Sequence, residues 1–449
     1  MASAPAIATG LLRPEEYEVN FDDLAPPLAT KQAVVDSSRC YFCHDAPCIE
    51  ACPTGIDIPS FIRGILTGNV RGAAMEILSA NIMGGACARV CPTEILCEAA
   101  CVREAQEGKP VKIGLLQRYA TDWLMERGLQ PFGRAPATGK RVAVVGAGPA
   151  GLSCAHGLAR QGHEVVVLER RGKGGGLNEY GIAAYKVTHG FAQREVDFIL
   201  GVGGIELRTG VALGREVHLE DLRRDYDAVY LAIGLDGVNA LGVPGEDLEG
   251  VIDAVEYIEA LRQAPDKATL PVGRDVVVIG GGNTAIDIAV QSRRLGAENV
   301  TIAYRRGPED MSATGHEQEI AQLNGVKIKH WVRPARLIGE DLQVEAIELE
   351  YTRPDSRGGV AGTGETFRLK ADMVFKAIGQ KLDAADLNGS AEQVGLKGGK
   401  IAIGEGCATS LAGVFAGGDA SGHVREDLTV VAVQDGKVAA QAIHRYLMG

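Results

Sequence analysis

The sequence has no uninterrupted run of 18 or more apolar residues, so it predicts no membrane-spanning helix. Basic residues are in the minority, with 46 Lys and Arg against 58 Asp and Glu, and the net charge of −12 argues against a nucleic-acid partner. The N-terminus has no basic stretch followed by an apolar core, so no secretory signal is expected. These absences predict a cytoplasmic protein.

At 449 residues, with 46% hydrophobic residues, the chain has room for about three globular domains. Glycine is abundant, with 59 residues, as expected where backbone must approach nucleotide phosphates.

Eight of the ten cysteines lie within residues 40–101. They are spaced as Cys40-x2-Cys43-x4-Cys48-x3-Cys52-Pro, then Cys87-x3-Cys91-Pro, then Cys97-x3-Cys101. Thiolates at such spacing can converge on one inorganic centre, and a Cys-Pro ending is typical of two-cluster ferredoxin segments. Structural zinc is the alternative, since it also uses pairs of closely spaced cysteines with four thiolates. In two-cluster segments the Cys before Pro often serves the other cluster, which predicts that Cys52 is separated from Cys40, Cys43 and Cys48.

Beyond the cysteines, the pattern predicts an all-α domain, a linker at 131–139, and two apolar strands at 141–145 and 275–279, each followed by a glycine-rich turn. We expect an α/β protein with an N-terminal all-α iron–sulfur domain and two Rossmann-like dinucleotide-binding domains of the disulfide-reductase type. The expected ranges are 1–135 for the cluster domain, 138–270 for the first flavin segment, 271–367 for the nicotinamide domain and 368–449 for the second flavin segment.

The first glycine turn, Gly146-Ala-Gly-Pro-Ala-Gly151, follows a strand and opens a helix, as a dinucleotide pyrophosphate requires. Glu169 ends the next strand about 20 residues further on, where a carboxylate can accept hydrogen bonds from ribose hydroxyls. A glycine run ending at Gly176 could lie along the flavin phosphates. The predicted contacts of this segment are Gly146, Gly148, Pro149, Ala150, Gly151, Glu169, Gly176 and Leu177. A plain Rossmann turn without ligand is the alternative.

Near the C-terminus, an apolar strand ends in Gly-Gly418-Asp419, and Asp419 is well placed to accept from the ribityl chain of a flavin. Thr429 and Val430 then enter an Ala-rich helix. Two other apolar strands end in Ile-Gly, at Gly234 and Gly379, and suit a fold with two dinucleotide sites. Read singly, each is an ordinary core strand.

The second glycine turn predicts the nicotinamide site, with contacts at Gly280, Gly282, Asn283 and Thr284. Its following strand ends at Arg305 and Arg306 instead of a carboxylate, which favours a ribose 2′-phosphate and therefore NADPH. If these arginines stack on adenine or pair with Glu309 or Asp310, NADH would serve equally well.

The cysteine pattern, with Pro-Thr after Cys91, resembles the N-terminal part of the dihydropyrimidine dehydrogenase family, and the glutamate synthase small subunit shares the plan. The resemblance implies two 4Fe–4S clusters. Their implied ligands are Cys40, Cys43, Cys48 and Cys101 for the first, and Cys52, Cys91, Cys97 and Gln117 for the second. Glutamate synthases carry glutamate at the position of Gln117, so Gln117 favours the pyrimidine enzyme. Cys87 is then interpreted as a buried packing residue.

The resemblance implies that NAD(P)H passes hydride to FAD and that single electrons leave through the clusters. The chain ends at Gly449 without an FMN barrel, so we expect an electron-input subunit whose separate FMN-containing catalytic partner reduces uracil or thymine within a hetero-oligomer. No catalytic side chain is expected for hydride transfer. The alternatives are a glutamate synthase small subunit, a bifurcating transhydrogenase subunit and a flavin-free scaffold.

The other candidate ligands are isolated. His44, His156 and His163 lack the spacing of metal ligands and are expected to be surface or packing residues. Cys154 falls in the helix after the first glycine turn and is expected to be a core residue. Cys407 has no CxxC partner, so a redox-active disulfide is not expected.

Overall fold

The computed structural model describes residues 7–356, 358–383, 387, 391–422 and 427–449. The chain forms two compact units. The larger unit comprises the described parts of Ala25–Glu179, His189–Gly237 and Lys381–Gly449, and the smaller unit those of Met1–Leu24, Tyr180–Thr188 and Val238–Gln380. Among the described residues, no helix is both long and apolar enough to cross a membrane.

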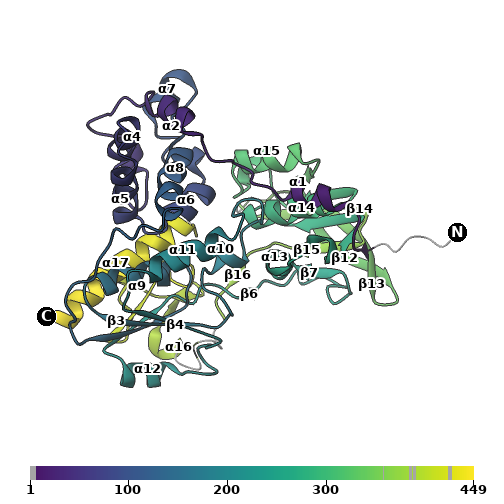
Figure 1. Ribbon diagram of the computed structural model, residues 1–449. Coiled ribbons are helices and arrows are strands. Elements are labelled where there is room, and N and C mark those ends of the chain that lie inside the picture. The colour runs from purple at the N-terminus through teal and green to yellow at the C-terminus, as the bar shows by residue number, and fades with distance from the viewer. Residues whose placement is uncertain (1–6, 357, 384–386, 388–390, 423–426) are drawn as a thin grey trace. The chain divides into compact units, whose positions relative to one another are not determined.

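The cysteine-rich part of the larger unit is helical, as predicted (Figure 1). Its elements are α2 (Thr30–Ser37), α3 (Pro47–Glu50), α4 (Ile58–Leu66), α5 (Val70–Ala80), α6 (Gly84–Val90), η1 (Thr93–Ile95), α7 (Val102–Glu107) and α8 (Ile113–Met125). Helix α4 begins after Asp57, whose carboxylate caps it by accepting from the Ser60 N–H at 3.0 Å. Its apolar face, with Phe61 and Ile65, packs into a core shared with α5 and α8. We refer to residues 25–129 as the cluster segment.

The remainder of the larger unit contains a five-stranded parallel sheet in the order β19-β5-β2-β3-β4. Its strands are β2 (Arg141–Val145), β3 (Glu164–Glu169), β4 (Ile205–Thr209), β5 (Ala228–Leu231) and β19 (Val414–Ala416). Alternate residues of β2 face opposite cores: Val142 and Val144 belong to the core that contains α9 and α17, and Ala143 and Val145 to the core beneath α12. Burial of both faces explains the continuous apolar run of β2.

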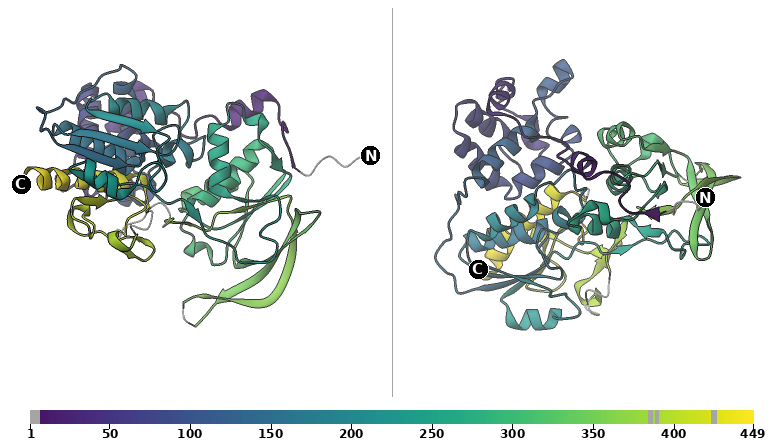
Figure 2. Two further views of the ribbon diagram at one scale, coloured as in Figure 1. Left: turned by 90° about the horizontal axis from the view of Figure 1, so that it is seen from below. Right: turned by 45° about the vertical axis from the view of Figure 1, so that its right-hand side comes forward.

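Helices α9 (Pro149–Arg160) and α17 (Thr429–Met448) pack side by side on this sheet (Figure 2, right). Their approach is close, because a Cβ on Gly436 of α17 would lie 2.2 Å from the carbonyl oxygen of Ala150. The other elements of this part are α10 (Leu177–Tyr180), α11 (Phe191–Leu200), α12 (Leu219–Asp225), α16 (Ala391–Val394), β17 (Leu396–Lys397), β18 (Lys400–Ile401) and η5 (Glu405–Cys407). The last helix of the chain is therefore central to the larger unit.

The smaller unit repeats the plan with the parallel sheet β11-β10-β9-β15-β7. This sheet and its helices are β7 (Val251–Asp253), α13 (Ala254–Gln263), β9 (Asp275–Ile279), α14 (Asn283–Leu295), β10 (Asn299–Ala303), α15 (Gly315–Leu323), β11 (Lys327–Lys329) and β15 (Met373–Lys376). An antiparallel sheet packs beside it, with a long β13–β14 hairpin (Figure 2, left). Its strands are β12 (Val332–Glu340), β13 (Gln343–Pro354) and β14 (Val360–Lys370). The predicted fold class is confirmed, and the antiparallel sheet adds to it.

The unit boundaries differ from the expected ranges at both ends of the nicotinamide segment. Strand β15, expected in the second flavin segment, pairs with β9 and β7 in the smaller unit because its apolar residues complete that sheet. Residues 7–24 also join this unit: β1 (Ile7–Ala8) pairs with β8 (Val272–Gly273), and Tyr17 of α1 (Pro14–Asn20) is buried there. The short elements η2 (Lys267–Thr269), η3 (Pro308–Asp310), β6 (Gly237–Val238) and β16 (Gln380–Lys381) complete the chain.

Candidate functional site

A first cavity in the cluster segment is lined by Cys40, Cys43, Cys48 and Cys101, the four residues predicted for one centre. The first two lie in the loop after α2, Cys48 lies in α3, and Cys101 precedes α7. Apolar side chains form most of the rest of the wall, including Ile62 of α4, and Arg103 also lines it. Cysteines 61 residues apart in the sequence thus share one space.

The thiols of this cavity oppose one another's ionisation. Burial, then the neighbouring thiols of Cys101 and Cys40, raise the pKa of Cys48 to about 12. Burial also raises the pKa of Cys40. A cationic centre would reverse this effect, because coordination removes the proton and compensates the thiolate charge. The donor set and its low-dielectric wall therefore fit an iron–sulfur cluster.

A second cavity is lined by Cys52, Cys91, Cys97 and Gln117, the set predicted for the other centre. Cys87 lines the same cavity, although the sequence suggested only a packing role for it. A hydrogen bond with Cys87, then burial, raises the pKa of Cys91. The four predicted residues and Cys87 give the cavity five cysteine and glutamine side chains, one more than a four-ligand cluster requires, and Asn81 and Thr93 also line it.

Two of these five compete for the last ligand position. The Gln117 side chain is 8% exposed, and its Nε2 donates to the Gly84 carbonyl at 2.7 Å. This bond fixes the amide and leaves its oxygen available to a cluster. Cys87 is 2% exposed and lies on α6, one turn before Cys91.

All ten cysteines are free thiols. Among the described residues, no three His, Cys, Asp or Glu side chains are close enough to share a single metal ion. Cys154 is buried outside the two cavities, as the sequence suggested, and Cys407 is buried outside them too.

The first glycine turn joins β2 to α9 in the larger unit. Gly146 has φ +102°, and a Cβ there would lie 2.2 Å from the Ala232 oxygen, so only glycine fits. Helix α9 begins with Pro149 at its first position, and the N–H groups that follow it in the first turn have no partner within the helix. Glu169 is buried, and its Oε2 accepts from the Ala147 N–H at 2.9 Å. Its carboxylate thus holds the turn and lies beside the place where a dinucleotide ribose would bind.

The other predicted flavin residues gather around this turn. A Cβ on Gly176 would lie 2.7 Å from the Gly148 Cα, so the second glycine loop contacts the first, with Leu177 following it. Gly418 also contacts the start of α9, because its Cβ would lie 3.0 Å from that of Ala150. Its neighbour Asp419 follows β19.

Helix α17 reaches both the flavin residues and the second cavity. At its start, the Thr429 hydroxyl is 3.4 Å from the Asn178 amide oxygen, next to the glycine loops. The following residue, Val430, lines the second cavity together with the cysteines. Gly234 lies beyond β5 in the larger unit, whereas Gly379 lies in the smaller unit after β15.

The second glycine turn joins β9 to α14 in the smaller unit. Gly280 has φ +144°, and a Cβ would lie 2.1 Å from the Ala377 oxygen. Gly282 is the N-cap of α14, and Asn283 and Thr284 form its first turn. The free N–H groups at this helix start suit a second pyrophosphate.

The two predicted 2′-phosphate ligands follow β10. Arg305 is exposed and Arg306 is half-buried, and neither has an ion pair within the described residues. Among the described side chains, Arg305 and Arg306 therefore do not pair with Glu309 or Asp310, which was the alternative. Both guanidinium groups are available to an anion.

A buried ion triad stabilises the nicotinamide turn and was not anticipated from the sequence. The Lys186 ammonium lies 2.7 Å from Asp287 Oδ1 of α14 and 2.7 Å from Glu317 Oε1 of α15. Asp287 also accepts from the Ala183 N–H at 3.2 Å. Segment 180–188 is thereby anchored to α14.

The cluster segment is also anchored to the sheet part of the larger unit through polar groups. Glu195 of α11 is fully buried and accepts from the Ala86 N–H at 2.9 Å, in the first turn of α6. Arg89, also on α6, lies over the ring of Phe191 of α11 at 3.5 Å and pairs with Asp122. No sequence motif marks these contacts, because each is a single polar residue on an apolar face.

Two parallel dinucleotide folds joined to a cysteine-lined helical segment define a class of nucleotide-dependent electron-transfer flavoproteins. Comparisons with known proteins agree. The profile described as pyridine nucleotide-disulphide oxidoreductase matches residues 140–436, and that described as dihydropyrimidine dehydrogenase domain II, 4Fe-4S cluster, matches residues 17–129.

Two Escherichia coli K12 proteins are similar over nearly their whole length. The NAD-dependent dihydropyrimidine dehydrogenase subunit PreT is 33% identical, covering 95% of this chain and 97% of PreT. The glutamate synthase [NADPH] small chain is 34% identical, covering 96% of this chain and 94% of that protein. Mycobacterium tuberculosis FprA, solved in complex with NADPH, shares the fold at a TM-score of 0.57 and 20% identity, over 70% of this chain and 85% of FprA.

The chain belongs to the pyridine nucleotide-disulphide oxidoreductases, in the group with an N-terminal dihydropyrimidine dehydrogenase domain II segment. The predicted enzyme class is confirmed: it is an NAD(P)-dependent flavin and iron–sulfur oxidoreductase. The predicted cofactor classes, FAD, 4Fe–4S and a nicotinamide nucleotide, are confirmed with it.

Proposed function

We propose that this protein is the electron-input subunit of a cytoplasmic dihydropyrimidine dehydrogenase. It would take electrons from NAD(P)H and deliver them to an FMN-containing partner that reduces uracil or thymine. The observation that carries this proposal is the sorting of the eight predicted cluster ligands into two cavities, one of which is also lined by Val430 of α17, the helix that starts at the flavin residues.

The chain's own residues would bind and orient the cofactors. The N-termini of α9 and α14 each offer unpaired N–H groups to a pyrophosphate, and Glu169 accepts from the flavin ribose. Bound FAD would supply hydride acceptance and one-electron release, chemistry that needs no side-chain acid or base. The protein's contribution is therefore placement and exclusion of water.

The two cavities would act in a fixed order. Val430 of α17, the helix that begins at the flavin residues, lines the second cavity, so the cluster of this cavity would take electrons from the flavin first. Tyr41, which is 48% exposed, lines the first cavity, so the cluster of this cavity would pass electrons to the partner.

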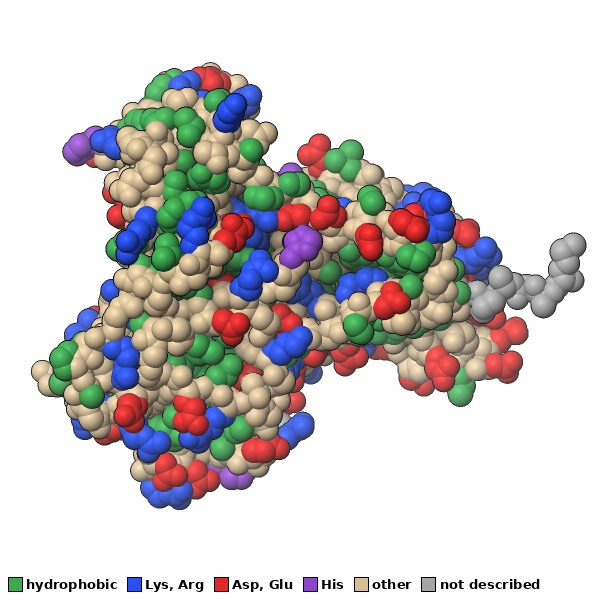
Figure 3. All heavy atoms as spheres, viewed as in Figure 1, with side chains coloured by type: hydrophobic (Ala, Val, Ile, Leu, Met, Phe, Trp, Pro, Cys, Tyr) green, Lys and Arg blue, Asp and Glu red, His purple; other side chains and the backbone are tan. Residues whose placement is uncertain are grey.

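Exposed apolar side chains of the cluster segment support a protein acceptor, and Tyr41 among them lines the first cavity. They are Val34, Val35, Tyr41, Met75 and Ile95. Figure 3 shows hydrophobic side chains gathered over the helices of the cluster segment. Exposed apolar groups beside a redox centre suit a docked protein subunit, in keeping with a hetero-oligomer.

Gln117 is the residue that favours a pyrimidine-reducing partner over glutamate synthase. Its amide is held at the second cavity by Gly84, in the position for a cluster ligand. The two E. coli relatives are named for the two different enzymes and are 33% and 34% identical to this chain. We therefore base the choice between the two enzymes on Gln117 and not on the degree of identity.

We propose NADPH as the favoured electron donor, because Arg305 and Arg306 follow β10 without acidic partners among the described side chains. The two relatives are named for different nucleotides, NAD for PreT and NADPH for the glutamate synthase chain. An Arg305→Ala/Arg306→Ala variant should therefore raise KM for NADPH more than KM for NADH.

The experiment is purification of the native complex, followed by assay of uracil-dependent NADH and NADPH oxidation. Uracil-dependent oxidation with FMN in the complex is the expected result. Glutamine- and 2-oxoglutarate-dependent oxidation without a response to uracil or thymine would overturn the pyrimidine assignment. Iron analysis of the purified subunit, with about eight irons per chain expected for two 4Fe–4S clusters, tests the cluster assignment separately.

Single variants identify the last ligand of the second cluster. Cys87→Ala should retain the wild-type iron content and EPR spectrum, whereas Gln117→Ala should alter the spectrum of one cluster. The reverse pattern would assign Cys87 as the ligand.

A further inference from the structure

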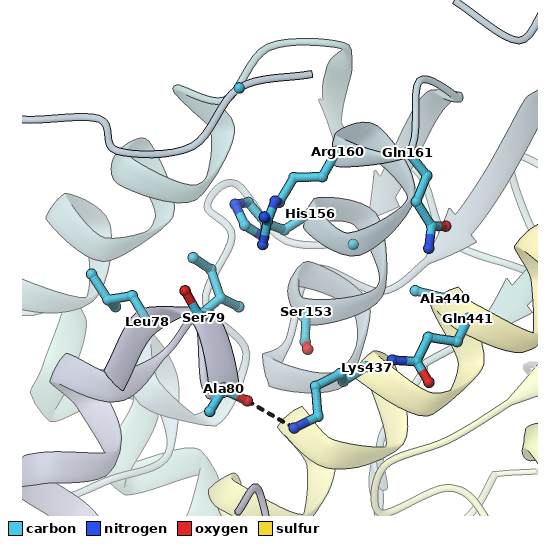
Figure 4. Close-up of a pocket in the computed structure, with 13 residues that line it drawn as sticks. Leu78, Ser79, Ala80, Ser153, His156, Arg160, Gln161, Lys437, Ala440 and Gln441 are labelled. Atoms are coloured by element: carbon cyan, nitrogen blue, oxygen red, sulfur yellow. Dashed lines mark hydrogen bonds between the residues drawn. The ribbon is translucent and has the colours of Figure 1, made fainter. Parts of the chain in front are cut away.

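Lys437 joins the helix of the flavin site to the cluster segment. It lies on α17, and its Nζ donates to the Thr54 carbonyl at 2.7 Å and to the Ala80 carbonyl at 2.9 Å. Figure 4 shows the side chain extending from α17 to the end of α5, with the bond to Ala80 drawn. One ammonium therefore binds two cluster-segment carbonyls that lie 26 residues apart in the sequence.

Both contacts lead to the second cavity. Thr54 is two residues beyond Cys52, and its hydroxyl lies 3.3 Å from the Cys52 Sγ. On α17, Lys437 follows Val430 by seven residues, which places both side chains on the same face of the helix. Val430 lines the second cavity, and Ala80 directly precedes Asn81, which lines it too, so both hydrogen bonds of Lys437 end beside residues of that wall.

The ammonium of Lys437 has two hydrogen-bond acceptors among the described residues, the carbonyl oxygens of Thr54 and Ala80. Burial lowers the pKa of Lys437, and the neighbouring Cys52 opposes that shift. Ala80 ends α5, where the helix dipole favours a cation. Lys437 and Arg160 also line a cavity of about 330 Å³ whose described lining contains no carboxylate. The positive charge is therefore not neutralised by an acidic group in that wall.

A fixed positive charge beside a cluster stabilises the reduced state, which carries one more electron. We propose that Lys437 is a positioning residue that holds the cluster segment on the flavin-site helix and raises the reduction potential of the second cluster. The inference rests on the proposed function, because it takes Cys52, Cys91 and Cys97 as ligands.

Three substitutions separate the charge of Lys437 from its hydrogen bonds. Lys437→Arg keeps both, Lys437→Gln keeps a donor without the charge, and Lys437→Met removes both. Lys397→Met, on the exposed β17–β18 hairpin, makes the same charge change away from the cysteine-lined walls and serves as the control. Each full-length protein is titrated under EPR, with iron and FAD content measured alongside.

We expect Lys437→Gln and Lys437→Met to shift the reduction equilibrium of one cluster at least tenfold toward the oxidised state, about 59 mV for one electron. Lys437→Arg and Lys397→Met should stay within threefold of wild type. Flavin reoxidation after rapid mixing with NADPH should slow in the same order.

Unchanged potentials in the Gln and Met variants, with full iron content, would overturn the inference while leaving the proposed function intact. A shift in the Met variant alone would also overturn it, since hydrogen bonding would then account for the effect without charge. A wild-type protein with no iron would instead refute the proposed function.

Discussion

Removing Lys186 should destabilise the nicotinamide-binding unit more than any surface charge change. Its ammonium bonds both Asp287 and Glu317, and the three side chains are only 9%, 7% and 16% exposed. Lys186→Met leaves two buried carboxylates without a cation. Breaking a buried pair in this way costs about 3–5 kcal/mol of the free energy of unfolding. The loss should appear in the smaller unit, which contains all three residues.

The two tryptophans allow the assay to report on each unit. Trp123 lies in the larger unit and Trp331 in the smaller one, so urea unfolding of a Trp123→Phe background follows the smaller unit alone. Lys370→Met is the matched control, because Lys370 pairs with Asp275 in the same unit but is 65% exposed. The control should cost less than about 1 kcal/mol.

The effect of Lys186→Met should depend on pH with a definite sign. Burial raises the pKa of Glu317, and loss of Lys186 raises it further because the lysine's opposing effect disappears. A carboxyl whose folded pKa lies above its unfolded value contributes stability at low pH that is lost as pH rises. The variant should therefore recover toward wild type near pH 5 and be least stable above neutrality. A cost no larger than that of Lys370→Met, or one that grows toward acid, would refute the reasoning.

Three further changes test other sites. Burial raises the pKa of Glu195 to about 7, so wild type should lose up to about 3 kcal/mol of stability between pH 4.5 and 7 that Glu195→Gln retains, measured by urea unfolding. Burial lowers the pKa of His156 to about 3, and its ring packs edge-on against Phe132. The His156→Phe variant should keep its stability at pH 7.5 within about 1 kcal/mol of wild type and should resist acid unfolding below pH 6.5 better than wild type. Greater acid sensitivity of the variant would contradict this. Gly280→Ala should slow NAD(P)H-dependent flavin reduction at least a hundredfold, with FAD and iron retained, because its Cβ would clash with Ala377. Gly315→Ala, at a position with open space around it, should leave this rate unchanged. Equal rates for the two variants in a stopped-flow assay would contradict the turn assignment.

Local patterns predicted the parts of this protein that depend on neighbours in sequence. A strand, a glycine turn and a helix follow one another at Gly146 and at Gly280, and backbone sterics at those two positions accept only glycine. The cysteine spacing, aided by the family resemblance, likewise separated Cys52 from Cys48, and the structure places them on different cavities.

The remainder depends on contacts between distant segments. Nothing near Tyr17 indicates that it packs against the nicotinamide-side core, and nothing near Lys186 indicates two carboxylates more than 100 residues away. Cys87 was interpreted as packing because spacing cannot show which wall of a helix faces a cavity. Strand β15 was expected in the flavin domain because an apolar strand carries no mark of the sheet it joins.

The position of α17 has a consequence for how the protein is made. The cysteines of the second cavity leave the ribosome long before α17, because Val430, one wall of that cavity, follows Cys97 by 333 residues. Lys437, which binds Thr54 and Ala80, is made later still. A nascent chain therefore exposes the second set of thiols to solvent until α17 has been synthesised, and assembly of that centre is expected to wait for this helix.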